Sequence, residues 1–339
     1  MQKVLSIRPV SFLAHASAVG QAETEGPYGN YFDFHDTSDR FGQTTWEQAE
    51  GELSHSVLNL ALKKAGLSHT RISALFSGDL QNQCVASSEG HLEDGIPYLG
   101  LYGACSTCTE GILLASVLLN VLEEGEIVAA VTTSHNSAAE RQFRTPIEYG
   151  GQRPPTAQWT ATAGGAFLLC RAREDLPRVV KVLPGVMVDG GVSDGFNMGA
   201  AMAPAAAHSI LRFLSDTHTK PSDYDAIVTG DLGREGSALL ELLLNEKGVG
   251  IAGIHRDCGS MMYDPDRSDC HSGGSGCGCS ASLLSAHFLP KLQSGEYKRI
   301  LFLSTGALMS PSSIQQGGSI LGVAPVIEIH APKETAVCG

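Results

Sequence analysis

The sequence has 339 residues, of which 42% are hydrophobic and 17% charged, a balance typical of a compact globular protein and not of a disordered one. Its formal net charge is −13, from 36 acidic and 23 basic residues, so no nucleic-acid partner is expected. Nine scattered cysteines indicate reduced thiols, and the sequence shows neither a signal peptide nor an apolar run long enough for a transmembrane segment.

The first half of the chain alternates strands and helices, which is the pattern of parallel βαβ units. Residues 1–45 are predicted to be an extended start followed by an ordered surface loop. A helix with apolar spacing is predicted over Trp46–Ala65, ending at Gly66. The remaining predictions for this half are strands over Ile72–Phe76, Tyr98–Tyr102, Glu126–Thr133 and Ala163–Cys170, an apolar helix over Ile112–Leu122, and a long polar loop with a functional role over residues 134–158.

The second half repeats the plan of the first. Its predicted elements are helices over Ala206–Ser215 and Ser280–Leu292, strands over Ala226–Val228, Ile300–Leu303 and Val326–Ile329, and a glycine-rich turn over Gly273–Cys279. Two short motifs recur in the same order: Ser77-Gly78-Asp79-Leu80 returns as Thr229-Gly230-Asp231-Leu232, and Leu113–Ser116 returns as Leu283–Ala286. The second match sets Cys105 opposite Ser275. We therefore predict a duplicated α/β fold with halves 1–172 and 173–339.

A Gly-Ala-Cys-Ser turn places Cys105 near the first turn of the predicted apolar helix. Free backbone N–H groups and the positive end of the helix dipole gather there, so the turn suits a nucleophilic thiol or an acidic ligand. A small thiol buried at a strand–helix junction is the alternative, because free cysteines are among the most buried residues.

Other motifs are weaker evidence for a functional site. Cys105 and Cys108, with Cys277, Cys279, Cys270 and His271, have a spacing that fits zinc or a redox dithiol, but small buried thiols explain them better. The glycine-rich run at Gly273–Gly278 lacks the ending of a phosphate-binding Walker loop, so we predict no nucleotide cofactor.

Three side chains follow predicted strands. His135 follows one directly, where open α/β sheets bind ligands, although a capping or surface histidine fits equally well. For Asp79 and Asp231, capping of turns or helices is favoured over proton transfer.

The duplicated halves with Cys105 at the start of a central helix resemble the thiolase and ketoacyl synthase superfamily. Within it the sequence is similar to the stage V sporulation protein AD family. The segments that carry the resemblance run across nearly the whole chain: Gly78–Gln83, Gly103–Thr107, Ser134–Asn136, Ala139–Arg144, Glu148–Gln152, Met202–Ala207, Thr229–Leu232, Gly273–Cys277, Thr305–Leu308 and Ile314–Gln316.

The resemblance implies a five-layered α/β/α/β/α thiolase-like fold and a role in endospore formation. It implies binding of dipicolinic acid (pyridine-2,6-dicarboxylate), free or as its calcium chelate, and support for its uptake into the developing spore. The implied partners are other SpoVA-type membrane proteins, with the protein itself soluble or peripheral at the spore inner membrane. By the same resemblance a homodimer is expected.

One departure from the enzymes of the superfamily argues against catalysis. A condensing site needs two further polar groups beside its thiol, commonly His and His or His and Asn. The matching positions here hold Asp231 and the pair Gly274 and Ser275, so little condensing activity is expected and Cys105 is a vestigial nucleophile.

We therefore predict a non-catalytic binding site without metal or cofactor. Its ligand-binding residues are predicted to be Cys105, Ser106, His135, Asn136, Arg141, Asp231, Gly274, Ser275 and Thr305. The alternatives are a thiolase-like acyltransferase that uses Cys105 as its nucleophile, and a purely structural subunit with a relic pocket.

Overall fold

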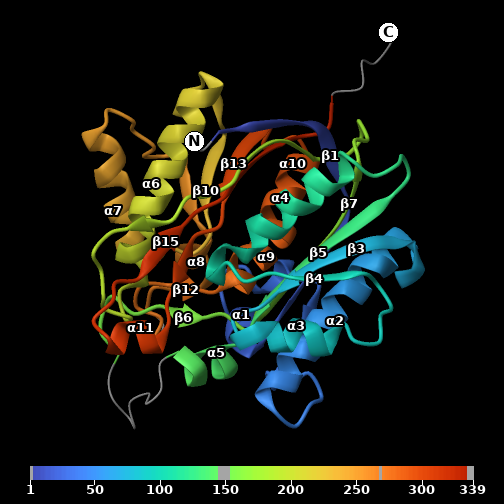
Figure 1. Cartoon of the computed structure of the whole chain (residues 1–339), viewed down its shortest axis with the longest axis horizontal. Coiled ribbons are helices and arrows are strands. Elements are labelled where there is room, and N and C mark those ends of the chain that lie inside the picture. Colours follow the sequence, from blue (N-terminus) through green and yellow to red (C-terminus); the bar gives the residue numbers. More distant parts are fainter. Residues whose placement is uncertain (1–2, 144–152, 267–268, 334–339) are drawn as a thin grey trace.

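The computed structural model describes residues 3–143, 153–266 and 269–333 (Figure 1). Arg144 and the Glu148–Gln152 segment named above lie outside the described residues. The elements of the first half are β1 (Leu5–Val19), α1 (Gln21–Thr24), β2 (Phe34–His35), α2 (Trp46–Ala65), β3 (Ile72–Gly78), α3 (Val85–Gly90), β4 (Tyr98–Gly100), α4 (Thr107–Leu119), β5 (Ile127–Ser134), α5 (Asn136–Phe143), β6 (Trp159–Thr160) and β7 (Ala163–Arg171).

The second half begins with β8. Its elements are β8 (Arg178–Leu183), β9 (Val188–Asp189), α6 (Met198–Thr217), β10 (Ala226–Thr229), α7 (Gly233–Glu246), β11 (His255–Asp257), α8 (Cys258–Met262), β12 (Gly274–Ser275), α9 (Cys277–Leu283), α10 (Leu289–Gln293), β13 (Arg299–Leu303), β14 (Gly306–Leu308), α11 (Pro311–Gln315), β15 (Leu321–Val323) and β16 (Val326–His330).

The two halves have the same strand order. The main sheet runs β11-β10-β13-β16-β8-β1-β7-β5-β3-β4, so each half contributes five of these strands in an equivalent order. The pairing directions also match: β7 and β16 are each antiparallel to both neighbours in this order, as are β1 and β8, while β3 and β10 pair in parallel on both sides. The repeated topology agrees with the repeated motifs. The division at residues 172 and 173 stays a prediction.

Helices and sheets form five layers. Helices α4 and α9 pack against each other in the middle of the molecule, while α2 covers the first half's strands and α6 packs with α7 outside the second half's strands (Figure 1). Side-chain alternation along single strands shows the layering. Val128 and Ala130 of β5 face the central core, whereas Ala129 and Val131 face the core under α2.

Helix α2 has the predicted limits because both of its ends are capped. The Thr45 side chain accepts a hydrogen bond from the backbone N–H of Gln48 at 3.2 Å, and Gly66 ends the helix with φ +66°. Leu53, Val57 and the other apolar side chains at helical spacing are buried, so its apolar stripe faces the core as the sequence predicts.

Several predictions were inaccurate in extent. The helix predicted over Ile112–Leu122 is α4, which begins at Thr107 and ends at Leu119, and the strand predicted over Tyr98–Tyr102 ends at Gly100. Residues 5–19 are not merely an extended start: β1 is a 15-residue strand that joins the two halves of the sheet. The predicted loop over residues 134–158 contains α5, which begins directly after β5. Helix α6 begins at Met198 and includes Pro204, eight residues earlier than the predicted start at Ala206.

The predicted helix over Ser280–Leu292 is interrupted by a π-helical turn at Leu284–Phe288. Pro290 lies just after this turn and has no backbone N–H, so a regular hydrogen bond to the carbonyl of Ala286 cannot form. The wider turn relieves this mismatch.

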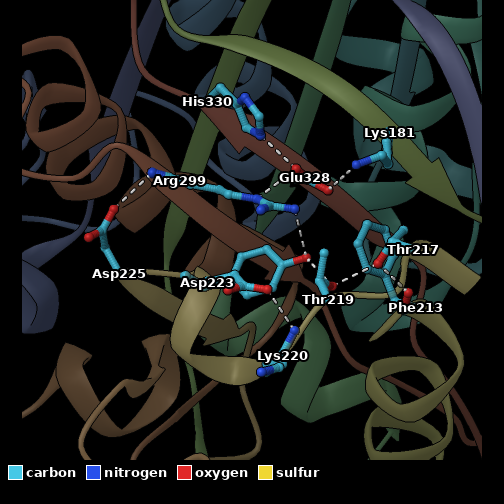
Figure 2. A network of polar contacts seen from close by, with 11 residues as sticks. Lys181, Phe213, Thr217, Thr219, Lys220, Asp223, Asp225, Arg299, Glu328 and His330 are labelled. Atoms are coloured by element: carbon cyan, nitrogen blue, oxygen red, sulfur yellow. Dashed lines mark hydrogen bonds and ion pairs between the residues drawn. The ribbon is translucent and has the colours of Figure 1, made fainter. Parts of the chain in front are cut away.

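A buried ion cluster ties three strands of the second half together (Figure 2). Glu328 of β16 is fully buried and lies 2.8 Å from Arg299 Nε of β13, 3.2 Å from Lys181 Nζ of β8 and 2.6 Å from His330 Nε2. Burial alone would raise the pKa of Glu328, but these neighbours outweigh it and hold the pKa at about 2.

Within the described residues, every helix falls short of the length and apolar character that crossing a bilayer requires.

Candidate functional site

Cys105 lies in a tight 3-10 turn over Ala104–Ser106, immediately before α4 and not inside its first turn. Ala104 has φ +51°, a left-handed conformation that residues other than glycine seldom adopt. The turn is fixed by hydrogen bonds: Thr107 Oγ1 donates to the Ala104 carbonyl at 2.7 Å and accepts from the Gly103 N–H at 3.0 Å. This network holds the thiol in one position.

The turn from the second half meets Cys105 as the duplication predicts. Cys105 Sγ lies 3.8 Å from Ser275 Oγ, and Ser275 Oγ donates to Asp231 Oδ2 at 3.3 Å. The Gly276 N–H also donates to Oδ2, at 2.8 Å, and Thr305 Oγ1 donates to Oδ1 at 2.9 Å. Gly276 has φ +104°, which a side chain would disfavour.

Burial controls the charge of this cluster. Asp231 is fully buried, and burial raises its pKa to about 7, against hydrogen bonds from Cys105, Gly276 and Thr305 that favour the carboxylate. Burial also raises the pKa of Cys105 well above its ordinary value, and the neighbouring Asp231 raises it further. The thiol is therefore protonated at neutral pH, which makes it a poor nucleophile.

A pocket opens beside Cys105 and Ser275 and encloses about 400 Å³ of empty space, open solvent at its mouth included. Its lining is Leu80, Tyr102, Ala104, Cys105, Ala139, Phe143, Thr160, Met198, Ser275, Ala307 and Met309. None of these described lining residues is basic, so the pocket wall is mainly apolar with a few hydroxyl and thiol groups.

The side chains of His135 and Asn136 are not part of this lining and are hydrogen-bonded to other groups. His135 Nε2 lies 2.7 Å from the Asp39 carbonyl, and the imidazole packs on Trp46 with ring centroids 5.3 Å apart. Asn136 Nδ2 donates to the Thr160 carbonyl at 3.0 Å. Both side chains therefore hold the start of α5 in place. His135 is fully buried, so it is not the surface histidine of the alternative interpretation.

Three more predicted site residues also lie outside the pocket lining. Arg141 is 59% exposed at its side chain and pairs with Glu47. Ser106 Oγ donates to the Gly103 carbonyl at 2.7 Å, and Ser106 borders a different cavity on the other side of the turn. The Gly274 carbonyl accepts from Gln158 Nε2 at 2.7 Å.

The structure thus brings together Cys105, Asp231, Ser275 and Thr305. It adds apolar lining residues, such as Phe143 and Met198, that sequence reasoning did not identify. Their signal in the sequence is weak because nothing distinguishes them from core residues before the tertiary fold places them.

Asp79, the counterpart of Asp231 in the first half, has the predicted capping role. Its carboxylate accepts from the backbone N–H groups of Gln81 and Ser87, each at 2.7 Å. The equivalent support for α7 comes from Asp257, which accepts from the N–H groups of Leu232 at 2.8 Å and Gly233 at 2.9 Å. Asp231 therefore does not cap α7 as predicted, and its carboxyl lies beside the Cys105 and Ser275 side chains instead.

The cysteines do not form the zinc or redox groupings considered above. All eight cysteines within the described part of the chain are free thiols. Burial raises the pKa of Cys108 to about 12, against hydrogen bonds with Ser280 and Ser304, so this thiol faces hydroxyls and does not pair with Cys105.

Comparisons with known sequences identify a family. The sequence model of a family described as Stage V sporulation protein AD (SpoVAD) matches residues 2–330. Stage V sporulation protein AD of Bacillus subtilis (strain 168) is 40% identical over 316 residues, which cover 93% of this chain and 93% of that protein.

Solved structures with the same fold include condensing enzymes. FabH, the 3-oxoacyl-(acyl carrier protein) synthase III of Xanthomonas oryzae, has a TM-score of 0.58 at 15% identity, covering 95% of this chain and 100% of that one. Cerulenin-bound OleA of Xanthomonas campestris has a TM-score of 0.57 at 15% identity, covering 95% and 98%. AbyA1, a tetronic acid condensing enzyme, has a TM-score of 0.54 at 16% identity, covering 94% and 99%. At these identities the likeness shows the thiolase-like fold alone. The chain belongs to the stage V sporulation protein AD family of sporulation proteins and is built on that fold.

Proposed function

We propose that the pocket beside Cys105 binds dipicolinic acid or its calcium chelate, and that the protein supports its uptake into the developing endospore without condensing chemistry. The environment of the Cys105 thiol supports the absence of condensing activity. Asp231 and Ser275 lie beside Cys105, and no imidazole is found among the described residues that line the pocket. A buried thiol with a raised pKa beside a carboxyl group lacks the base that a condensing enzyme uses.

The same groups are suited to holding a ligand. Dipicolinate is a flat aromatic ring with two carboxylates, and the apolar side chains of Leu80, Phe143 and Met198 offer a surface for the ring. The Cys105 thiol is a donor at one end of the pocket, beside the Ser275 hydroxyl. When Asp231 is protonated, which its pKa of about 7 allows, it no longer needs the Ser275 proton, and the Ser275 hydroxyl can donate to a ligand.

Charge favours the calcium chelate. The described pocket lining contains no basic side chain, and Asp231 lies just behind it. A bare dianion would be poorly compensated there, whereas a one-to-one calcium chelate carries no net charge. We therefore expect calcium to strengthen the binding of dipicolinate.

Calorimetry tests the proposal. Dipicolinate titrated into the full chain should give saturable binding, tighter with calcium present. Ser275→Leu should abolish it by filling the pocket, and Cys105→Ala should weaken it. Ser222→Leu, at an exposed serine of the second half, is the matched control and should bind normally. Absence of binding to the folded wild-type chain would refute the proposal.

An acyltransferase is the second candidate, favoured by the apolar pocket wall next to a retained thiol. Incubation with acyl-CoA, followed by mass spectrometry of the Cys105 peptide, distinguishes an acyltransferase from a non-catalytic binding protein. We expect no acyl adduct at Cys105. A stable thioester would assign the acyl-transfer function instead.

We also propose that the chain acts as a homodimer, together with SpoVA-type membrane proteins, at the spore inner membrane. The edge strand β4 supports the dimer. It is one end of the main sheet, its three residues are exposed, and Tyr98 and Leu99 present large apolar side chains there. Pairing two β4 strands would cover this edge.

A further inference from the structure

Three histidines surround one carboxylate on the outer side of the first half, apart from the Cys105 pocket. His91 Nδ1 lies 2.8 Å from Asp94 Oδ2, while His55 Nδ1 and His69 Nε2 lie 3.1 Å and 3.3 Å from Asp94 Oδ1. These residues come from α2, from the short 3-10 turn after α2, and from the end of α3. The fold therefore brings four metal-ligating side chains together from separate segments.

The spacing of the ligand atoms suits a single metal ion. One ligand atom each from His55, His91 and Asp94 lie within 4.8 Å of one another. Zinc–nitrogen and zinc–oxygen bonds of about 2.0–2.2 Å in a tetrahedron separate the ligand atoms by roughly 3.4 Å. Small side-chain rotations would close the difference. His69 lies outside this group of three, but its Nε2 is 3.3 Å from Asp94 Oδ1.

Two of the ring nitrogens lack a hydrogen bond. Within the described part of the chain, His55 Nδ1 and His69 Nε2 are buried and have no hydrogen-bond partner, although Asp94 lies at ion-pair distance from both. Buried ring nitrogens are normally satisfied. A metal ion between these nitrogens and the carboxylate would satisfy both at once.

The far side of two imidazoles contacts polar side chains. His91 Nε2 lies 2.9 Å from Ser54 Oγ, and Asn59 Nδ2 lies 2.8 Å from His55 Nε2, to which it donates in the metal-free protein. After a metal takes the near nitrogen, the Ser54 hydroxyl can accept the ring N–H of His91, and the Asn59 amide can accept that of His55 once it turns over to present Oδ1. Such outer partners orient histidine ligands in known metal sites.

A surface cleft reaches one of the four residues. Its lining includes His55 together with Glu52, Glu89 and Glu93. These three carboxylates raise the local concentration of cations beside His55.

We propose that His55, His91 and Asp94, with His69 as fourth ligand, form a binding site for a divalent transition metal, zinc in the first place. Imidazole nitrogens with one carboxylate and a tetrahedral arrangement suit zinc better than calcium or magnesium, which prefer oxygen ligands. The bound ion would link α2 to the end of α3 and to the chain before β3. The role is structural, because the site lies away from the Cys105 pocket.

Metal titration of the full chain tests the site. Chelator-treated protein is titrated with zinc in competition with a chromophoric chelator, and one tight site per chain is expected, with a higher melting temperature when zinc is bound. His69→Gln and His91→Gln should each weaken binding about tenfold or more. His208→Gln, at an exposed histidine of α6, is the matched control and should bind as the wild type does.

Cobalt provides an independent readout, because a tetrahedral cobalt site absorbs in the visible region. Its absorption should appear in the wild type and in His208→Gln, and disappear in His69→Gln. If His91→Gln does not fold, the partly exposed His69 still supplies the test. Failure of the wild type to bind zinc, or equal binding by His69→Gln and His208→Gln, would overturn the proposal.

Discussion

Asp231 controls the ionisation of Cys105 because the carboxyl lies beside the thiol in a dry site. Replacing it by asparagine removes the nearby negative charge, so Asp231→Asn should lower the pKa of Cys105. Each unit by which that pKa falls raises the thiolate fraction about tenfold. Iodoacetamide should therefore alkylate Cys105 faster in the variant at pH 7–8, as measured by mass spectrometry of the peptide.

Cys170 serves as the internal control for this experiment. It is a half-buried free thiol on β7 and its pKa is raised by burial, with Arg173 and Asp175 as its charged neighbours and not Asp231. Its alkylation rate should be the same in both proteins. Identical pH–rate profiles for Cys105 in wild type and variant would show that the carboxyl does not govern the thiol.

The raised pKa of Asp231 also predicts a pH dependence for ligand binding. Below pH 7 the protonated carboxyl can donate a hydrogen bond, and above pH 7 the carboxylate repels a dianion. Without calcium, dipicolinate affinity should fall as the pH rises from 6 to 8, by up to about tenfold per unit above the pKa. Calorimetry in Asp231→Asn should show no such slope. A flat profile in the wild type would contradict this role.

At the scale of elements, the fully buried Glu328 links β16 to β13 and β8 through Arg299 and Lys181 (Figure 2). Glu328→Gln leaves two cations without their carboxylate, so it should lower the free energy of unfolding by about 3–5 kcal/mol at pH 7. Urea unfolding measures this. Glu174→Gln, which removes a solvent-exposed ion pair with Lys333, should change the free energy of unfolding far less than Glu328→Gln does.

Lowering the pH should remove the stabilisation that the charged Glu328 provides. The pKa of Glu328 is held at about 2, below its ordinary 4.5, so its stabilisation is complete above pH 4.5 and is lost as the pH falls toward 2. The difference in the free energy of unfolding between wild type and Glu328→Gln should therefore shrink as the pH falls from 4.5 to 2. A constant difference would mean that the charge is not what stabilises the strands.

The elements that sequence predicts best are those with local end signals. Helix α2 has a capping threonine at one end and a glycine at the other, and its limits are as predicted. Strand β1 has no such signal. Several of its residues, among them Ser11, Ala16 and Ser17, are small or polar yet fully buried, because helices such as α2 and α9 cover the faces of the sheet at this strand. Only the tertiary fold makes that segment a central strand.

The site was predictable where duplication constrains it. The offset between repeats placed Ser275 opposite Cys105, and the two atoms are 3.8 Å apart. His135 and Arg141 were chosen for their chemistry and their position in the chain. The structure directs them to Asp39 and Glu47, since the direction of a side chain after a strand depends on packing that the sequence does not display.

At the scale of the whole molecule, the exposed edge at β4 predicts self-association. Leu99 is 45% exposed there, and its replacement by arginine would place like charges opposite each other in a symmetric β4 pair. Light scattering should show a dimer for the wild type and a monomer for Leu99→Arg. Leu242→Arg, at an exposed leucine of α7, should remain dimeric. A monomeric wild type would rule out the dimer.

We propose that the pocket beside Cys105 holds dipicolinate without reacting with it. A crystal structure of the full chain with dipicolinate and calcium is the decisive test. We expect ligand density between the apolar wall and the Cys105 and Ser275 side chains, with an unmodified thiol and with Asp231 behind it. Dipicolinate bound elsewhere on the molecule, with this pocket empty, would contradict it.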